Sequence, residues 1–261
     1  MPVTGFATYL ECPYRYYLKH VLRLRSCDDE SLELGPALFG TLAHKVLAEF
    51  AQSEYAACSD PAPIIDFFSS SLQREYEEQF TQTAVPAVVL QFEQLRARLC
   101  EFASWQARWV EAGWEISECE SPFDREDLVI DLPNGELMEV QGRIDRIDYN
   151  SKSNEWHVID YKTGDRLRTS NYIYREGEGW SDLQLPLYRR VLRSRLGKDA
   201  QIKIGYLSLG AAQSEVDLCE IDMGEPELEE AWECAKNVAA KIAGGEFWPP
   251  SEEVYHGDEL G

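Results

Sequence analysis

The sequence predicts an α/β or α+β fold, in which a mixed, mainly antiparallel sheet is flanked by helices and preceded by an N-terminal helical wrap. Through residue 112 the apolar residues recur at helical spacing. From about residue 114 the period shortens towards two, as in strands, and helical patterns return after residue 180. This order indicates one sheet packed against helices. We expect a single domain over 1–261, mainly helical over 1–113 and carrying the sheet over 114–261.

The N-terminal part is expected to hold helices over 4–25, 38–57 and 64–112. The first begins at Thr4, and Pro13 marks a kink or a second start because proline has no N–H to donate within a helix. Breaks around Pro86 divide the last stretch. Its aromatic residues recur at helical spacing, which favours core packing over a cofactor role.

The second part is expected to combine strands and helices. The predicted strands cover 114–120, 127–132, 136–149, 156–162 and 201–209. The tripeptide PNG at 133–135 is typical of a tight hairpin turn. Helices are expected over 181–197 and 226–243.

The composition is typical of a soluble cytoplasmic protein. Hydrophobic residues make up 44% and charged residues 28% of the chain, and no apolar run is long enough to span a bilayer. Charged residues interrupt the N-terminal stretch where a secretory signal would need an apolar core. The seven cysteines form an odd number without a CxxC pair, which favours a reducing compartment over a disulfide framework.

The charge is strongly negative and unevenly distributed. The net charge is −22, from 47 acidic and 25 basic residues, and 14 of the acids lie in 215–261. Such a field repels nucleic acid at low salt. In contrast, 13–25 contains no acid, and Arg15, Lys19 and Arg23 share one helix face. That face is either a solvated surface or one that follows phosphates.

The stretch VIDYKT places an acid and a lysine on one strand. Alternation puts Asp160 and Lys162 on the same face. If 140–148 pairs with this strand through a loop at about 150–155, Asp145 lies opposite Asp160. Two opposed carboxylates repel each other unless a cation lies between them, and Mg²⁺ suits such a site. Alternatively, neighbouring arginines and the lysine neutralise the acids in a surface ladder.

Six matches in order resemble the PD-(D/E)xK nuclease superfamily, specifically its RecB and AddB type exonuclease domain. The catalytic hairpin of that family is matched by GRIDRID (142–148) and VIDYKTG (158–164). The other matches are CPYRYYLKHVLRL (12–24), FGTLAHKVL (39–47), ESPF (120–123), QLPLY (184–188) and GGEFWPP (244–250). The resemblance implies a restriction-endonuclease-like core and the hydrolysis of phosphodiester bonds.

The resemblance also implies a metal ion, Mg²⁺ or Mn²⁺. Asp145 and Asp160 would ligate it, with the Tyr161 carbonyl as a further ligand. His44 would approach the metal from an N-terminal helix, and Glu120 would support it from a neighbouring strand. Taken alone, a histidine at a helix boundary is more often structural, and Glu120 also fits an ordinary acid at the rim.

Three further residues acquire roles from the resemblance. Lys162 would position or activate the attacking water and offset charge in the transition state. Gln184 and Tyr188 would orient this lysine and the nucleic-acid backbone. Alternatively, Ser181 and Gln184 form an S-x-x-Q capping box, and Tyr188 is a core residue.

Two features limit what the resemblance implies. Many relatives hold a [4Fe-4S] cluster through one cysteine in the CPYRYYL position and three near the C-terminus. Here Cys12 is present, but no cysteine follows Cys234, so we expect no iron–sulfur cluster. The sequence has no G-x-x-x-x-G-K-[ST] motif, so a helicase partner would be a separate chain.

The predicted function is that of a metal-dependent DNA nuclease, an exonuclease acting on DNA ends or single strands in repair or recombination. The residues expected to line a nucleic-acid channel are Arg15, Lys19, Arg23, Arg189 and Arg190. The alternative is a non-catalytic DNA-end-binding or scaffolding subunit of a helicase–nuclease complex. A degenerate domain would be expected to lose the aspartates or lysine of the hairpin, and all three are present.

Overall fold

The structure is a computed structural model that describes residues 1–24, 33–79, 85–164, 173–175, 179–210 and 216–251. Its centre is a five-stranded sheet with the strand order β1-β4-β5-β8-β9. These strands are β1 (Trp114–Phe123), β4 (Gly142–Asn150), β5 (Glu155–Lys162), β8 (Gln201–Ser208) and β9 (Asp217–Glu220). Within this sheet β5 and β8 run parallel and the other neighbours are antiparallel. The predicted mixed, mainly antiparallel sheet is therefore confirmed.

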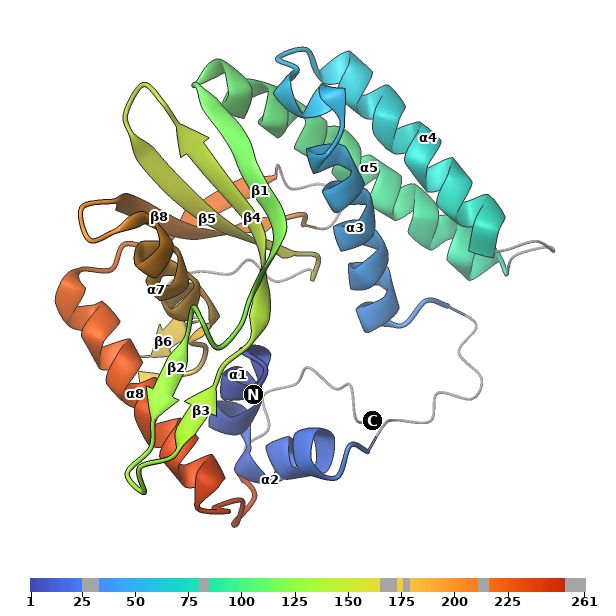
Figure 1. Ribbon diagram of the computed structural model, residues 1–261. Coiled ribbons are helices and arrows are strands. Elements are labelled where there is room, and N and C mark those ends of the chain that lie inside the picture. Colours follow the sequence, from blue (N-terminus) through green and yellow to red (C-terminus); the bar gives the residue numbers. More distant parts are fainter. Residues whose placement is uncertain (25–32, 80–84, 165–172, 176–178, 211–215, 252–261) are drawn as a thin grey trace.

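Helices cover both faces of this sheet. The helices are α1 (Thr4–Glu11), α2 (Pro13–Tyr16), α3 (Pro36–Ala51), α4 (Pro61–Gln79), α5 (Pro86–Glu111), α7 (Gln184–Leu196) and α8 (Glu225–Ala243). A π-helical turn, η1 (Tyr17–Val21), follows α2, and a 3-10 turn, η2 (Glu54–Ala57), follows α3. Figure 1 shows α3, α4 and α5 on one side of the sheet and α7 and α8 on the other. In the described part of the chain, no helix has the length and apolar character needed to cross a membrane.

Prolines account for several helix starts. Helices α2, α3 and α5 begin at Pro13, Pro36 and Pro86, because the fixed φ and missing N–H of proline suit the first helical turn. The first helical stretch is therefore broken at Pro13, as the sequence predicts. The stretch predicted over 64–112 divides at Pro86 into α4 and α5.

The stretch predicted as one strand over 136–149 is two strands. Two small hairpins lie outside the main sheet, β2 (Val129–Asp131) with β3 (Leu137–Glu139) and β6 (Tyr174–Arg175) with β7 (Gly179–Trp180). The first has the predicted turn, in which Gly135 adopts a φ of 84°. After it, Gln141 bonds to the N-terminal segment, donating to the Met1 carbonyl and accepting from Val3 N–H, both at 2.9 Å. The chain start therefore interrupts the strand beside β4.

Two other boundaries differ from the sequence prediction. The helix predicted over 181–197 begins at Gln184, where Leu183 is the N-cap and the Gln184 N–H donates to Asp182 Oδ1 at 2.8 Å. Strand β9 was not predicted, because its four residues are too few for a clear alternation. It pairs with β8 at the edge of the sheet.

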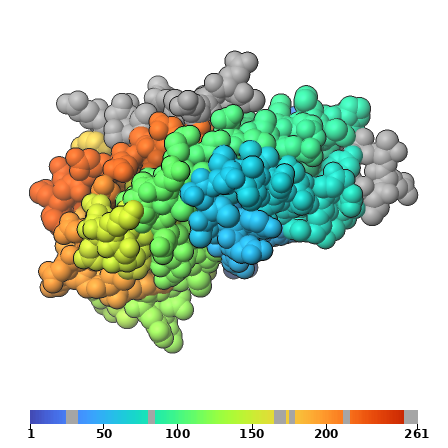
Figure 2. All heavy atoms as spheres, turned by 90° about the horizontal axis from the view of Figure 1, so that it is seen from above, coloured from blue at the N-terminus to red at the C-terminus, as the bar shows by residue number. Residues whose placement is uncertain are grey.

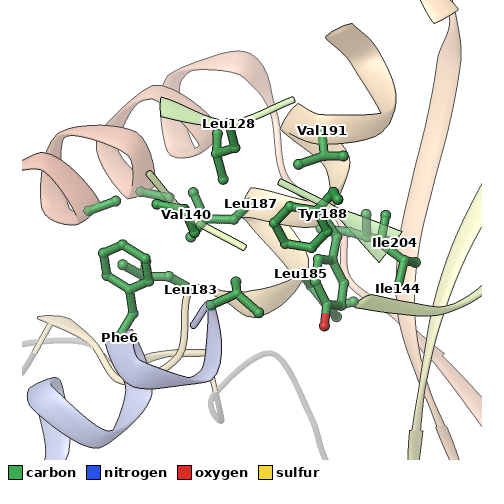
Figure 3. Close-up of a cluster of buried hydrophobic side chains, with 14 of the residues drawn as sticks. Phe6, Leu128, Val140, Ile144, Leu183, Leu185, Leu187, Tyr188, Val191 and Ile204 are labelled. Atoms are coloured by element: carbon green, nitrogen blue, oxygen red, sulfur yellow. The ribbon is translucent and has the colours of Figure 1, made fainter. Parts of the chain in front are cut away.

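The sheet separates two hydrophobic clusters. Alternation along β5 places Val158 in the cluster with α1, α7 and α8, and Ile159 in the cluster with α3, α4 and α5. Figure 3 shows part of the first cluster, in which Leu185 and Tyr188 lie near Ile144 of β4. From above, α4 and α8 lie towards opposite ends of the molecule (Figure 2). Because both faces of the central strands are covered, their polar side chains meet solvent near the strand ends.

Candidate active site

Three acids lie in a row across three neighbouring strands. The β4–β5 ladder runs to the pair Arg146 and Ile159. Continued by one residue, this register brings Asp145 opposite Asp160, as the sequence predicts, and the Asp160 carboxylate is near enough to raise the pKa of Asp145. On the other side, the β1–β4 register brings Glu120 opposite Asp145. Carboxylates from three separate strands therefore converge at one end of the sheet.

His44 of α3 completes a group of possible metal ligands. Its Nδ1 lies 3.6 Å from Asp145 Oδ2 and 3.9 Å from Glu120 Oε1. One donor atom from each of these three residues lies within 4.8 Å of the others. Burial lowers the pKa of His44, so its imidazole is neutral near pH 7 and able to act as a ligand. Carboxylate oxygens with one imidazole suit a divalent cation such as Mg²⁺ or Mn²⁺.

Glu120 reaches this group through an unusual backbone conformation. Its φ is 49°, in the left-handed region that residues other than glycine rarely adopt. Such a conformation costs on the order of 1–3 kcal/mol and persists where the surroundings impose it. The pairing of β1 with β4 continues on both sides of this residue. The strands therefore hold Glu120 in a strained position beside His44 and Asp145.

The charge of Asp145 is poorly compensated by the protein. Its Oδ2 accepts the Tyr161 N–H at 2.9 Å, and its side chain is 12% exposed. Burial and then the nearby Asp160 carboxylate raise the pKa of Asp145 well above its usual range. A cation between the two carboxylates would remove this repulsion. The donor set therefore fits a divalent metal.

Lys162 is fixed beside the acids. Its Nζ lies 2.6 Å from Asp160 Oδ2 and 5.2 Å from the centre of the Tyr206 ring. The Asp160 side chain is almost fully buried, whereas that of Lys162 is 21% exposed. The ion pair and the cation–π contact hold the ammonium group in place while leaving it accessible from the pocket.

Helix α7 supports β4 through a chain of hydrogen bonds. Gln184 Nε2 donates to the Tyr188 hydroxyl at 2.7 Å, and this hydroxyl donates to the Arg143 carbonyl at 2.8 Å. Tyr188 is also a core residue, because its side chain is fully buried. Burial raises the pKa of Tyr188, so its hydroxyl stays protonated. The Gln184 N–H donates to Asp182 Oδ1, and the Gln184 side chain is directed to Tyr188 and not back to Ser181, which differs from the alternative capping box. The QLPLY motif thus fixes the strand just before Asp145.

Arg143 is a pocket residue that the sequence reasoning did not assign to the site. It lies two residues before Asp145 on the same strand, and its side chain is 65% exposed. Its Nε donates to Glu120 Oε2. Alternation with Asp145 was the signal that pointed to it, whereas its partner on β1 is a long-range contact. The guanidinium is placed to meet an anion that enters the pocket.

One open pocket of about 360 Å³ collects these groups. The site residues in its wall are His44, Asp145, Asp160, Tyr161, Lys162, Gln184 and Tyr188. Pro2 and Val3, together with Thr4 at the start of α1, form another part of the wall. The N-terminal segment therefore meets α3, the sheet and α7 at one site.

The basic residues of the N-terminal helices lie outside this pocket wall. Arg15 of α2 has its Nη1 3.9 Å from Glu11 Oε1. Lys19 and Arg23 are exposed on η1 and just after it. A contact between these residues and nucleic acid stays a prediction.

The arginines of α7 lie between that helix and α8. Arg189 Nε donates to the Ile202 carbonyl at 3.1 Å, and its Nη2 lies 3.3 Å from Glu225 Oε1. The Arg190 guanidinium lies 3.9 Å from the centre of the Trp232 ring. Both residues therefore take part in helix packing, and their contact with nucleic acid also stays a prediction.

Comparison with known families gives a match over almost the whole chain. A family model of the PD-(D/E)XK nuclease superfamily matches residues 2–253. This range includes every candidate residue described above.

Curated relatives include two proteins whose names describe one subunit of an ATP-dependent helicase/deoxyribonuclease. The one from Clostridium novyi (strain NT) is 25% identical over 198 residues, which cover 67% of this chain and 16% of that protein. The one from Carboxydothermus hydrogenoformans is 28% identical over 180 residues, which cover 63% of this chain and 16% of that protein. The match thus spans about a sixth of the length of these relatives.

Among solved structures, a Eubacterium rectale protein with a provisional exonuclease name has a similar fold. The TM-score is 0.53 at 15% sequence identity, over 98% of this chain and 85% of that one. At this identity the likeness concerns the fold alone.

Proposed function

Because the chain belongs to the PD-(D/E)XK nuclease superfamily, we propose that it is a Mg²⁺- or Mn²⁺-dependent nuclease that hydrolyses phosphodiester bonds in DNA. The observation that carries this proposal is the convergence of Asp145, Asp160 and Lys162 in one pocket. Two carboxylates that repel each other, with a lysine beside them, are groups suited to metal-assisted attack of water on phosphorus.

We assign the metal ligands from the resemblance to the family, and the structure supports part of the set, since His44, Glu120 and Asp145 have donor atoms within 4.8 Å of one another. Asp145, Asp160 and His44 would hold the cation, with Glu120 in support and the Tyr161 carbonyl as a further ligand. When bound, the cation polarises a phosphate oxygen and lowers the pKa of a water molecule. The neutral imidazole and the raised pKa of Asp145 both fit a group that gains from binding a cation.

The remaining site residues act on the water and the substrate. Lys162 orients the attacking water and offsets the negative charge that develops on the phosphate oxygens. Gln184 and Tyr188 keep β4 in place through the Arg143 carbonyl. The Arg143 guanidinium contacts a substrate phosphate, because it is exposed at the pocket and bidentate geometry suits phosphate oxygens.

The finer assignment is an exonuclease that acts on DNA ends or single strands in repair or recombination. The relatives are named as one subunit of a helicase/deoxyribonuclease, which supports DNA as the substrate and a separate helicase chain as the partner. The residues proposed to contact the nucleic acid outside the pocket are Arg15, Lys19, Arg23, Arg189 and Arg190. A cytoplasmic location agrees with the free thiols of the described cysteines.

The test is a cleavage assay on linear single-stranded, linear double-stranded and circular DNA, with Mg²⁺, Mn²⁺ or a chelator. We expect cleavage that requires a metal, spares circular DNA and is lost in Asp160→Ala. The matched control is Asp131→Asn, which alters an exposed acid on the β2–β3 hairpin and should leave cleavage unchanged. Cleavage by Asp160→Ala in the presence of chelator would show that the site is assigned wrongly.

The alternative is a non-catalytic DNA-end-binding or scaffolding subunit of a helicase–nuclease complex. The presence of both aspartates and the lysine at one pocket favours turnover, because a scaffold has no need of two carboxylates that repel each other. Binding to DNA ends without cleavage, with a helicase partner supplied, would favour the scaffold.

A further inference from the structure

An aromatic path leads from the first turn of α1 to the protein surface through Tyr16, Phe247, Tyr17, Tyr14 and Trp248. In this order the neighbouring ring centres are 6.0, 5.2, 6.4 and 5.6 Å apart. Rings at these separations are in contact with one another. The path joins α2 and η1 to the segment that follows α8.

The inner end of the path contacts α1 next to a residue of the pocket wall. Thr4 lines the pocket. At the next residue, Gly5, an added Cβ would lie 3.1 Å from Tyr16 Cε2, so the ring packs against the first turn of α1. Tyr16 itself is buried. The path therefore packs against the same helical turn that contributes Thr4 to the pocket wall.

The outer end of the path is exposed although it is fixed in place. Trp248 is 74% exposed, the highest value among the large hydrophobic residues that are exposed in the described part of the chain. The segment around it is held on both sides. The Tyr9 hydroxyl donates to the Glu246 carbonyl at 2.6 Å, and Ser251 N–H donates to Cys12 Sγ at 3.5 Å. An indole held in this way loses little freedom when a flat group stacks on it.

One of the two segments that form the path has a charge opposite to that of the whole chain. The net charge of the protein is −22, yet the residues from Pro13 to Leu24 include two arginines, one lysine and no acid. Lys19 and Arg23 are exposed on this segment. An exposed ring that packs on a segment with basic side chains suits a polyanion that also presents flat apolar groups.

We propose that the aromatic path binds unpaired nucleotides of the substrate, with bases stacking on Trp248 and Tyr14 while the basic residues of the segment contact the phosphates. This inference rests on the proposed nuclease function and narrows its substrate to a strand with unpaired bases. Stacking on aromatic rings together with charge along the backbone is the general mode of single-strand binding. In a duplex the faces of the bases are already stacked and unavailable.

The experiment measures binding of a fluorescent oligothymidylate of about 12 nucleotides, in chelator so that no cleavage occurs. Trp248→Ala should weaken binding roughly 5- to 150-fold, the range expected for the loss of one base–aromatic stack. Trp248→Phe should restore most of the affinity because it keeps a ring. The matched control is Leu137→Ala, which removes another exposed apolar side chain, on β3, and should leave binding unchanged.

A second substrate separates stacking from charge. An abasic strand of the same length keeps the phosphates, so the wild type should bind it weakly and Trp248→Ala should cause no further loss. Blunt duplex DNA should bind equally to both proteins. Equal affinity of wild type and Trp248→Ala for oligothymidylate, or equal weakening on the abasic strand, would overturn the proposal. Dissociation of an oligomer by Trp248→Ala, with strand binding intact, would instead make this surface a protein interface.

The binding assay is independent of turnover. If the wild type cleaves DNA but Trp248→Ala binds oligothymidylate normally, the proposed role of the aromatic path is wrong and the nuclease function stands. If the wild type cleaves no DNA but its strand binding depends on Trp248, the path stands and the nuclease function fails.

Discussion

Asp145 and Asp148 lie three residues apart on β4, yet their surroundings differ completely. Asp148 is fully buried and accepts from Arg146 Nε at 2.7 Å and Nη2 at 2.6 Å. It also accepts from Trp109 Nε1 at 2.6 Å. Asp145 accepts the Tyr161 N–H and faces a second carboxylate. One strand therefore carries one acid that the fold satisfies and another that it does not.

The difference teaches which of two acids in a motif is available for chemistry. A buried carboxylate with a bidentate guanidinium needs no further partner, whereas an acid whose pKa is raised by a neighbouring acid is a candidate for function. Tyr161 connects the two sides, because its N–H bonds to Asp145 while its hydroxyl accepts from Arg146 Nη1 at 3.3 Å. The ion pair of Arg146 and Asp148 thus helps to hold β5, through Tyr161, beside Asp145.

Asp145→Asn is the strongest test of this contrast. We expect cleavage to fall on the order of 1,000-fold or more, because a ligand carboxylate is removed. Stability should stay the same or rise, because repulsion with Asp160 is relieved. Cleavage rates and thermal unfolding in chelator measure the two effects. An unfolded variant would place Asp145 among the structural acids and break the comparison.

Arg146→Ala tests the buried ion pair of Arg146 and Asp148. The variant should lose about 3–5 kcal/mol of unfolding free energy, because Asp148 remains as a buried charge without its partner. The matched control is the double variant Arg146→Met with Asp148→Leu, which leaves neither charge and should lose less. Urea unfolding measures both. Equal losses in the two variants would mean that the packing of the side chains, rather than the charge pair, stabilises this region.

His157 makes the stability of the region around the Arg146–Asp148 pair depend on pH. The residue is fully buried, with its ring centre 5.7 Å from those of both Trp109 and Trp114. Burial, followed by the charges of Lys203 and Arg146, lowers the pKa of His157 to about 3. The unfolded chain, with a pKa of about 6.5, then binds more protons between these values, so stability falls as the pH drops below about 6.5.

His157→Phe keeps an aromatic ring at this position but removes the group that titrates. Between pH 7 and about pH 5 the wild type should lose about 2 kcal/mol more unfolding free energy than the variant, from 1.36 kcal/mol per pH unit. Urea unfolding at the two pH values measures the difference. Parallel losses in the two proteins would assign the pH dependence to other groups.

The sequence predicted those features of the site that depend on local pattern. Asp145 and Asp160 face each other because a short turn fixes the register of β4 and β5, and alternation then fixes their faces. The interruption of the strand at Gln141 was missed because it depends on the N-terminal segment, which is far from Gln141 in the sequence but bonds to it in the folded chain. The left-handed backbone of Glu120 was missed because strand alternation contains no signal for it.

The helix start at Gln184 shows a similar limit. Ser181 and Asp182 both precede it, and both residue types favour helix N-termini. The choice of Asp182 follows from Tyr206, whose hydroxyl donates to the other Asp182 oxygen at 3.1 Å from β8. The sequence thus located the helix, while a contact from another strand orients the acid that bonds to the N–H of its first residue.

Arg143→Gln tests the surroundings of Asp145 and is expected to have the smallest effect of these variants. The ion pair between Arg143 and Glu120 is exposed on the arginine side, so its loss should scarcely change stability. DNA affinity should fall about 10-fold, and the slope of affinity against salt should decrease by about one, because one phosphate contact is lost. Mn²⁺ affinity without DNA should stay equal or rise, since Glu120 is freed. Arg125→Gln is the matched control, because Arg125 is 68% exposed and pairs with Glu139 away from the pocket wall. An equal loss of DNA affinity in both variants would show that Arg143 contributes only general positive charge.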